Sequence, residues 1–352
     1  MNHETFTNKN KRSQRSCSKV SLQKIYICFY CTISDPDRFC VLSFILQLTK
    51  RRKKNATAKA QQKMENEYKK AKKEAEKEKT SLKPWYTYHG IAHALGGLNG
   101  KQYLNSIDGF YSNYQKGYRI FEMDLQLTSD NVLVGRHTWG DNLSDPLSKH
   151  GDPASYREFK NTKLCGRYKP TSFLDMLNAM ERYKDFYLMT DSKSTDTPTV
   201  QKEFSTLVQT AKKAGKTEYL DRLIVQIYNE NMYYTIKKIY PFKHFVYTTY
   251  KQRDVAFYKM VKFCKKNGFE GVTSPQNDIN DYRMDILAKE GIYGFTHTVN
   301  NSYFTKEYMK LGVYGIYSDF MTPSEINKNY LEVYCPKFAS RYMKTVIPAL
   351  GK

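Results

Sequence analysis

Eight short stretches rich in β-forming residues alternate with amphipathic helical stretches between residues 84 and 325, and this alternation constrains the fold most strongly. Eight strand–helix units in about 250 residues are typical of a (β/α)8 barrel, so we predict an α/β fold, a TIM barrel. An open doubly wound sheet is the alternative. It would need a glycine-rich phosphate loop after its first strand, and His93-Ala-Leu-Gly-Gly97 lacks that spacing. The predicted strands are residues 90–95, 119–127 with 132–137 as one barrel position, 186–192, 222–228, 244–249, 271–273, 291–298 and 313–318.

Positive charge is concentrated before the predicted barrel. The chain has 57 Lys and Arg against 35 Asp and Glu, and residues 1–83 hold 21 of the basic and 8 of the acidic side chains. We predict a basic, partly apolar N-terminal arm over residues 1–54, a charged helical spacer over 55–83 and the barrel over 84–352. The apolar runs 25–33 and 39–48 are each too short to span a membrane.

The arm has several interpretations. Its basic block beside apolar residues would favour an anionic membrane surface, which would place the protein at a membrane or the cell envelope rather than in the cytoplasm. A disordered tail or a wrongly assigned start codon are the alternatives. Nucleic acid is not an expected partner, because no zinc finger, helix-turn-helix or aromatic RNA-binding signature is present.

Two acidic residues lie on one predicted strand, in the segment Arg119-Ile-Phe-Glu-Met-Asp-Leu-Gln-Leu-Thr128. Side chains alternate along a strand, so Glu122 and Asp124 share one face while apolar residues occupy the other. In a barrel this polar face points inward, near the rim where active sites form. A hard divalent cation would compensate the two enclosed carboxylates. An ion pair with a lysine or arginine of a neighbouring strand is the alternative.

Two further strand ends carry charged residues. Asp191 can supply a third carboxylate, and Lys193 beside it can hold an anion. His93 ends the first predicted strand and His137 ends the strand after the turn at residues 129–131. Histidine suits proton transfer near neutral pH, and a metal with a lysine suits a phosphoryl group.

These motifs, in this order, resemble the glycerophosphodiester phosphodiesterase family of the phosphatidylinositol-phospholipase-C-like superfamily over residues 88–325. The resemblance rests on the following residues: His93 followed by glycines, Asn105-Ser106, Gly117, Glu122-x-Asp124, Leu127-Thr128-x-Asp130, Val134, His137, Asp191-x-Lys193, Thr298-Val-Asn300 and Gly312-Val-Tyr-Gly-Ile-Tyr-Ser-Asp319.

The resemblance implies roles for these residues. His93 and His137 would be the general acid and base, and Lys193 would stabilise charge on the phosphate. In the family, a substrate hydroxyl next to the ester can attack first and give a cyclic phosphate. Mg2+ or Ca2+ would be held by Glu122, Asp124 and Asp191.

The chain departs from the family pattern at several positions. Ala94 stands where the family usually has a phosphate-contacting Arg, and Arg136 is a candidate substitute, although on an ideal strand it would point away from the site. Thr138 replaces the usual Asp, and His297 the usual Trp. Asp191 stands where the family commonly has Glu. This Asp-x-Lys form also occurs in the sphingomyelinase-D-type lipases of the same superfamily. The candidate substrate-binding residues are Arg136, His297 and Asn300.

These observations predict a phosphoric diester hydrolase. The leading hypothesis is a metal-dependent phosphodiesterase acting on glycerophosphodiesters or on a related glycerol-phosphate headgroup or polymer. One alternative is a phospholipase, sphingomyelinase-D-like or phospholipase-C-like, acting on intact lipids. Another is a catalytically silent barrel that binds a phosphorylated ligand.

Overall fold

The computed structural model describes residues 82–140, 143–149, 151–250 and 257–333, together with Gln62 and Asn66, which are helical. The predicted arm over residues 1–54 lies outside the described residues. The predicted spacer over residues 55–83 also lies outside them, apart from four positions. The structural account that follows therefore concerns the barrel.

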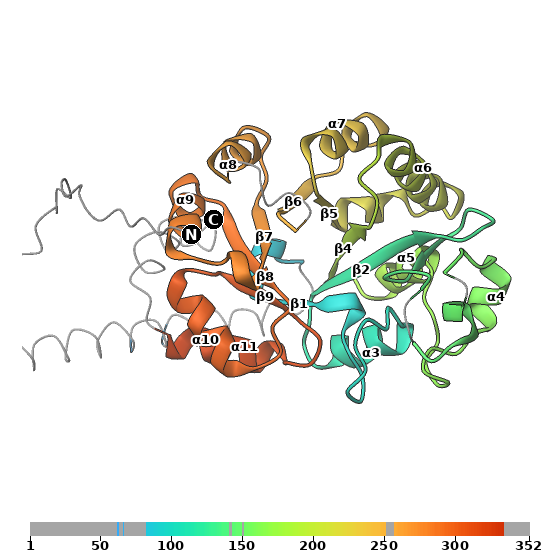
Figure 1. Cartoon of the computed structure of the whole chain (residues 1–352), viewed down its shortest axis with the longest axis horizontal. Coiled ribbons are helices and arrows are strands. Elements are labelled where there is room, and N and C mark those ends of the chain that lie inside the picture. The colour runs from blue at the N-terminus through green and yellow to red at the C-terminus, as the bar shows by residue number, and fades with distance from the viewer. Residues whose placement is uncertain are drawn as a thin grey trace, which may run out of the picture. The chain divides into compact units, whose positions relative to one another are not determined.

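Eight parallel strands close into a barrel, as the sequence predicted (Figure 1). The sheet runs in the order β1-β9-β8-β7-β6-β5-β4-β2, and β1 also pairs with β2, which closes it. A short ninth strand, β3 (Leu133–Gly135), pairs antiparallel with the end of β2, so the two segments do share one barrel position. The barrel strands are β1 (Gly90–Ala92), β2 (Ile120–Leu127), β4 (Tyr187–Ser192), β5 (Leu223–Ile227), β6 (His244–Thr248), β7 (Gly271–Pro275), β8 (Tyr293–His297) and β9 (Gly315–Ser318).

Helices surround the strands (Figure 1). Several of them begin within about six residues of a strand end, where an Asn, Asp or Thr side chain caps the first turn by accepting a backbone N–H bond, as Asn229, Asn280 and Asn301 do. No helix within the described ranges is long and apolar enough to cross a membrane. The helices are α3 (Ile107–Gln115), α4 (Tyr156–Asn161), α5 (Phe173–Arg182), α6 (Thr197–Lys213), α7 (Glu230–Ile239), α8 (Phe257–Lys266), α9 (Asp281–Glu290), α10 (Ser302–Leu311) and α11 (Pro323–Glu332).

Aromatic side chains fill the end of the barrel at which the strands begin. Trp85, in the short helical turn before β1, is fully buried and stacks on Phe295 with 5.6 Å between ring centroids. Gly271 leaves room for this ring, because a Cβ there would lie 2.9 Å from Trp85. The apolar plug leaves the opposite, carboxyl-terminal end of the strands as the place for polar chemistry.

The strand β1 ends earlier than the sequence predicted. The prediction was residues 90–95, but the chain leaves the strand after Ala92 and makes a 3-10 turn over His93–Leu95. Ala94 and Leu95 adopt positive φ angles of 48° and 63°, which no strand can contain. The turn places the backbone N–H of Ala94 against Glu122, which a continuing strand would not do.

Candidate active site

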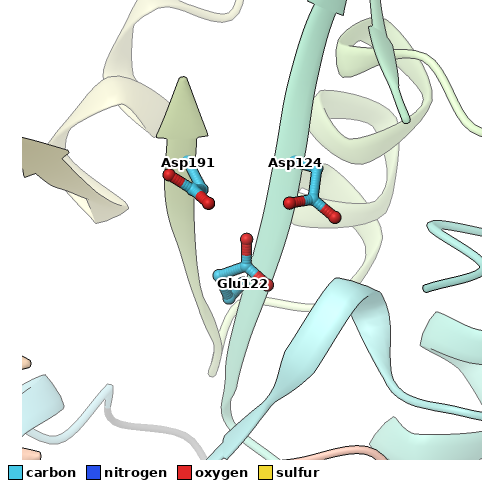
Figure 2. A group of neighbouring side chains, drawn as sticks. All are labelled: Glu122, Asp124 and Asp191. Atoms are coloured by element: carbon cyan, nitrogen blue, oxygen red, sulfur yellow. The ribbon is translucent and has the colours of Figure 1, made fainter. Parts of the chain in front are cut away.

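Three carboxylates from two adjacent strands gather at the carboxyl-terminal end of the barrel. Glu122 and Asp124 extend from the same face of β2, and Asp191 lies on β4 directly opposite Asp124 in the ladder. All three are at least 94% buried, and one ligand oxygen from each lies within 4.8 Å of the others. Figure 2 shows the three side chains turned toward one shared space. This cluster is a candidate site for a divalent cation.

One oxygen of each carboxylate accepts a hydrogen bond that fixes the side chain. The three donors come from different parts of the chain. The backbone N–H of Ala94 donates to Glu122 Oε2 at 2.8 Å. The amide of Asn105 donates to Asp124 Oδ2 at 2.7 Å, and the hydroxyl of Tyr228 donates to Asp191 Oδ1. Such outer contacts fix the orientation of metal-binding carboxylates.

Of the opposite oxygens, only that of Glu122 is without a contact among the described residues, and Lys193 contacts those of both aspartates. Glu122 Oε1 is buried and has no hydrogen-bond partner among the described residues. The ammonium group of Lys193 bridges the two aspartates, lying 2.5 Å from Asp124 Oδ1 and in contact with Asp191 Oδ2. Positive charge therefore already occupies part of this space. Three carboxylate oxygens suit a hard cation such as Mg2+ or Ca2+, so the residues fit the group that the sequence implied.

The pKa values of Glu122 and Asp124 are shifted in opposite directions. Burial, reinforced by the charge of Asp124, raises the pKa of Glu122 to about 8. Burial also acts to raise the pKa of Asp124, but Lys193, the nearby histidines and the Asn105 hydrogen bond together outweigh it and the pKa is lowered. Without a cation, Glu122 therefore retains its proton at neutral pH while Asp124 is ionised.

His93 is oriented by the carboxylate of the residue that directly follows the last barrel strand. Its Nδ1 lies 2.9 Å from Asp319 Oδ1, and Asp319 is itself fixed by Asn300, whose amide donates to Oδ2 at 2.8 Å. Burial acts to lower the pKa of His93, but the hydrogen bond to Asp319 and the nearby carboxylates raise it to about 9. With Nδ1 engaged, Nε2 is the nitrogen left for proton transfer.

His137 lies on the loop after β3, and one aromatic ring separates it from His93. The ring of Tyr103 is 4.9 Å from the ring of His93 and 5.0 Å from that of His137. The backbone of His137 is held by Gln126, whose amide donates to the carbonyl oxygen at 3.2 Å. The structure thus brings both predicted histidines to the rim that carries the carboxylates.

A third histidine forms part of the barrel wall beside the carboxylates. His297 ends β8, on the same strand face as Phe295, and its ring centroid is 5.9 Å from that of Tyr317. Its Nε2 atom is buried and finds no hydrogen-bond partner in the part of the chain that the structure describes. Burial and the charge of His93 lower the pKa of His297 to about 4, so the ring is neutral near pH 7.

Two predicted substrate contacts are not supported by the positions of the side chains. The guanidinium of Arg136 is fully buried against Asp145 at 3.3 Å, so it offers no accessible atom to a substrate. Asn300 uses its amide on Asp319 and Ser318, and so acts on His93 through Asp319.

The sequence did not reveal the residues that orient the carboxylates. Asn105 was noted only as part of a motif, and it reaches Asp124 because the loop before α3 takes a positive φ of 45°. Tyr228 follows Gln226 by two residues at the end of β5, so strand alternation could have placed it inside the barrel. His89, in contrast, is structural: its Nδ1 bonds the carbonyl of Tyr314 at 2.7 Å.

Solved structures with the same barrel support the fold. A protein from Silicibacter pomeroyi aligns over 70% of this chain and 93% of its own, with a TM-score of 0.59 and 15% identity. A glycerophosphodiester phosphodiesterase from Parabacteroides distasonis aligns over 69% and 96%, with a TM-score of 0.56 and 23% identity. A phosphodiesterase from Oleispira antarctica, solved with the product sn-glycerol-3-phosphate, aligns over 68% and 96%, with a TM-score of 0.54 and 16% identity. No curated protein sequence matches the chain.

The closed barrel gathers its carboxylates, histidines and lysine at the carboxyl-terminal rim, where TIM-barrel enzymes carry their active sites. The model of the glycerophosphoryl diester phosphodiesterase family matches residues 97–322, which is more than half of the chain. The chain belongs to this family. The matched range includes all three carboxylates, His137 and Lys193, and begins four residues after His93.

Proposed function

We propose that the protein hydrolyses glycerophosphodiesters, or a related glycerol-phosphate headgroup or polymer, with a divalent cation held by Glu122, Asp124 and Asp191. The observation that supports this most directly is the clustering of the three buried carboxylates, of which one ligand oxygen each lies within 4.8 Å of the others. Lys193 contacts one oxygen of each aspartate, so a cation would share this space with its ammonium group. When bound, Mg2+ or Ca2+ would supply positive charge for the phosphate oxygens.

The two histidines would divide the proton transfers between them. His93 holds a proton through its bond to Asp319, so we assign it the general acid that protonates the leaving oxygen. His137 would take the proton from the attacking hydroxyl as the new phosphorus–oxygen bond forms. Lys193 would lie beside the phosphate and offset its charge.

Leaving-group chemistry tests this assignment. A nitrophenyl ester leaves without a proton, whereas an alkoxide needs one. His93→Ala should therefore slow glycerophosphocholine turnover by about 10²–10⁴-fold and a nitrophenyl diester much less. His137→Ala should slow both substrates. His244→Gln is the matched control, since that ring bonds Glu270 at 2.7 Å at the start of β6.

Three results would contradict the proposal. The first is equal loss on both substrates in His93→Ala, which would remove the assigned acid role. The second is full turnover in the presence of a chelator, which would show that the reaction needs no cation. The third is ligand binding without turnover of any phosphodiester, which would favour the silent binding barrel.

We also propose that the barrel over residues 84–352 contains the whole catalytic unit, with the arm over residues 1–54 and the spacer over 55–83 serving attachment. The barrel core begins at Trp85, which supports a boundary there. A chain lacking residues 1–83 should then keep its turnover of soluble diesters. Loss of that turnover with the fold intact, checked by circular dichroism, would assign the arm a catalytic part.

A further inference from the structure

The exposed large apolar side chains of the barrel are unevenly placed. Nine such side chains are exposed among the described residues. Tyr111 and Tyr234 lie midway along α3 and α7, and Leu174 is in the first turn of α5. The remaining six, all aromatic, are near strand ends or helix starts from the end of β6 to the loop after β9: Tyr250, Tyr258, Tyr282, Tyr303, Phe304 and Phe320.

These six aromatic residues, here termed the aromatic crescent, belong to one rim. All carboxyl ends of parallel barrel strands lie on the same side, and the helices that follow them begin there. Tyr250 follows β6, Phe320 follows β9, and the others are in the first described turns of α8, α9 and α10. Because β6, β7, β8 and β9 are consecutive neighbours in the sheet, the crescent residues belong to one sector of the rim.

Two residues of the crescent lie next to residues of the candidate active site. The ring of Tyr250 lies 6.1 Å from that of His297, which forms part of the barrel wall beside the carboxylates. At the other end, Phe320 directly follows Asp319, the partner of His93. Tyr303 and Phe304 extend the same surface outward, with 5.3 Å between their ring centroids and exposures of 68% and 46%.

The composition and position of the crescent point to a lipid surface. Single exposed aromatic side chains are ordinary on soluble proteins, but here they gather on the side of the molecule where the substrate enters. Tyrosine has an apolar ring and a polar tip, and so it suits the boundary between lipid tails and water. A small soluble diester needs no such surface, whereas a diester in a lipid headgroup is presented at a bilayer.

We propose that the aromatic crescent docks the barrel on a phospholipid bilayer, so that the active site faces phosphodiester headgroups. This inference rests on the proposed function for its choice of substrate, and it extends that function from soluble diesters to membrane-borne ones. The docking surface belongs to the barrel and is independent of the N-terminal arm.

Vesicle binding by the full chain tests the proposal. Zwitterionic phosphatidylcholine vesicles in high salt suppress attraction through the positive charge of the chain and leave apolar contact as the main term. We expect Tyr303→Ser/Phe304→Ser to lower the vesicle partition coefficient, measured by sedimentation, by about tenfold. Tyr234→Ser is the matched control, because Tyr234 is 49% exposed but lies midway along α7.

The outcomes are distinct. Both variants should keep wild-type melting and wild-type turnover of soluble glycerophosphocholine, and only the double variant should lose turnover of vesicle-borne diester. Docking is overturned if the wild-type chain stays off the vesicles, or if the double variant and the control bind equally. Concentration-dependent self-association that the double variant abolishes would instead make a second copy the occupant. A chain that binds vesicles but turns over no soluble diester would contradict the proposed reaction and leave docking supported.

Discussion

The bond between Asp319 and His93 gives a quantitative prediction. Asp319 is buried, and its Oδ1 lies 2.9 Å from Nδ1 of His93. Asparagine at position 319 would keep the size of the side chain and an oxygen that accepts from Nδ1, but it would remove the negative charge. Asp319→Asn therefore isolates the charge of this residue from its shape.

The magnitude follows from the pKa of His93. That pKa is raised from 6.5 to about 9 even though burial acts to lower it. At about 1.4 kcal/mol for each unit, the net rise amounts to roughly 3 kcal/mol in favour of the protonated ring. Without the charge of Asp319, less attraction opposes the lowering of the His93 pKa by burial. We therefore expect this pKa to fall by at least about one unit.

The assay is a titration of the histidine ring signals by nuclear magnetic resonance in the metal-free protein. The His93 signal is assigned by its absence in His93→Gln. Turnover of glycerophosphocholine should fall by about 10²-fold in Asp319→Asn, and that of a nitrophenyl diester much less, because only the first needs the acid. Asp185→Asn is the control, since Asp185 pairs with Arg119 at 2.7 Å ahead of β4.

The stability of the fold should change with the same sign. A pKa raised on folding contributes stability that is present below the unfolded value of 6.5 and is lost as the pH rises through about 9. Asp319→Asn should therefore destabilise the metal-free protein more at about pH 6 than above about pH 9. A His93 pKa that stays within about 0.3 unit of wild type would refute the reasoning, whatever happens to turnover.

Three further predictions concern the carboxylates and the His137 loop. The pKa of Glu122 is raised from 4.5 to about 8, so the stability of the metal-free protein should fall as the pH rises between these values and recover when Mg2+ or Ca2+ is added. A melting temperature that does not change with pH in the presence of chelator would contradict this. Asn105→Ala should weaken metal affinity by about 10–100-fold in calorimetry, and unchanged affinity would show that its bond to Asp124 is dispensable. Arg136→Met removes the buried guanidinium that pairs with Asp145 and should lower the free energy of unfolding in urea by about 3–5 kcal/mol; a loss under about 1 kcal/mol would contradict a structural role.

The strand pattern alone predicted the barrel well, because alternation and helix periodicity are local properties. The pairing of two sequence segments as one barrel position is confirmed by β2 and β3. The predicted end of the first strand was wrong, since the positive φ angles at Ala94 and Leu95 arise in a turn that packs against Glu122. The residue types at positions 93 to 95 do not predict such a turn.

The sequence by itself determined which residue types reach the rim: carboxylates on β2 and β4, a lysine after β4 and histidines after β1 and β3. Strand alternation and the common direction of parallel strands are sufficient for that. Only the tertiary structure decided which oxygen of each carboxylate is held, that Asp319 orients His93, and that Arg136 is buried on Asp145. These contacts join residues up to 226 positions apart, so they depend on barrel closure and loop geometry rather than on any local pattern.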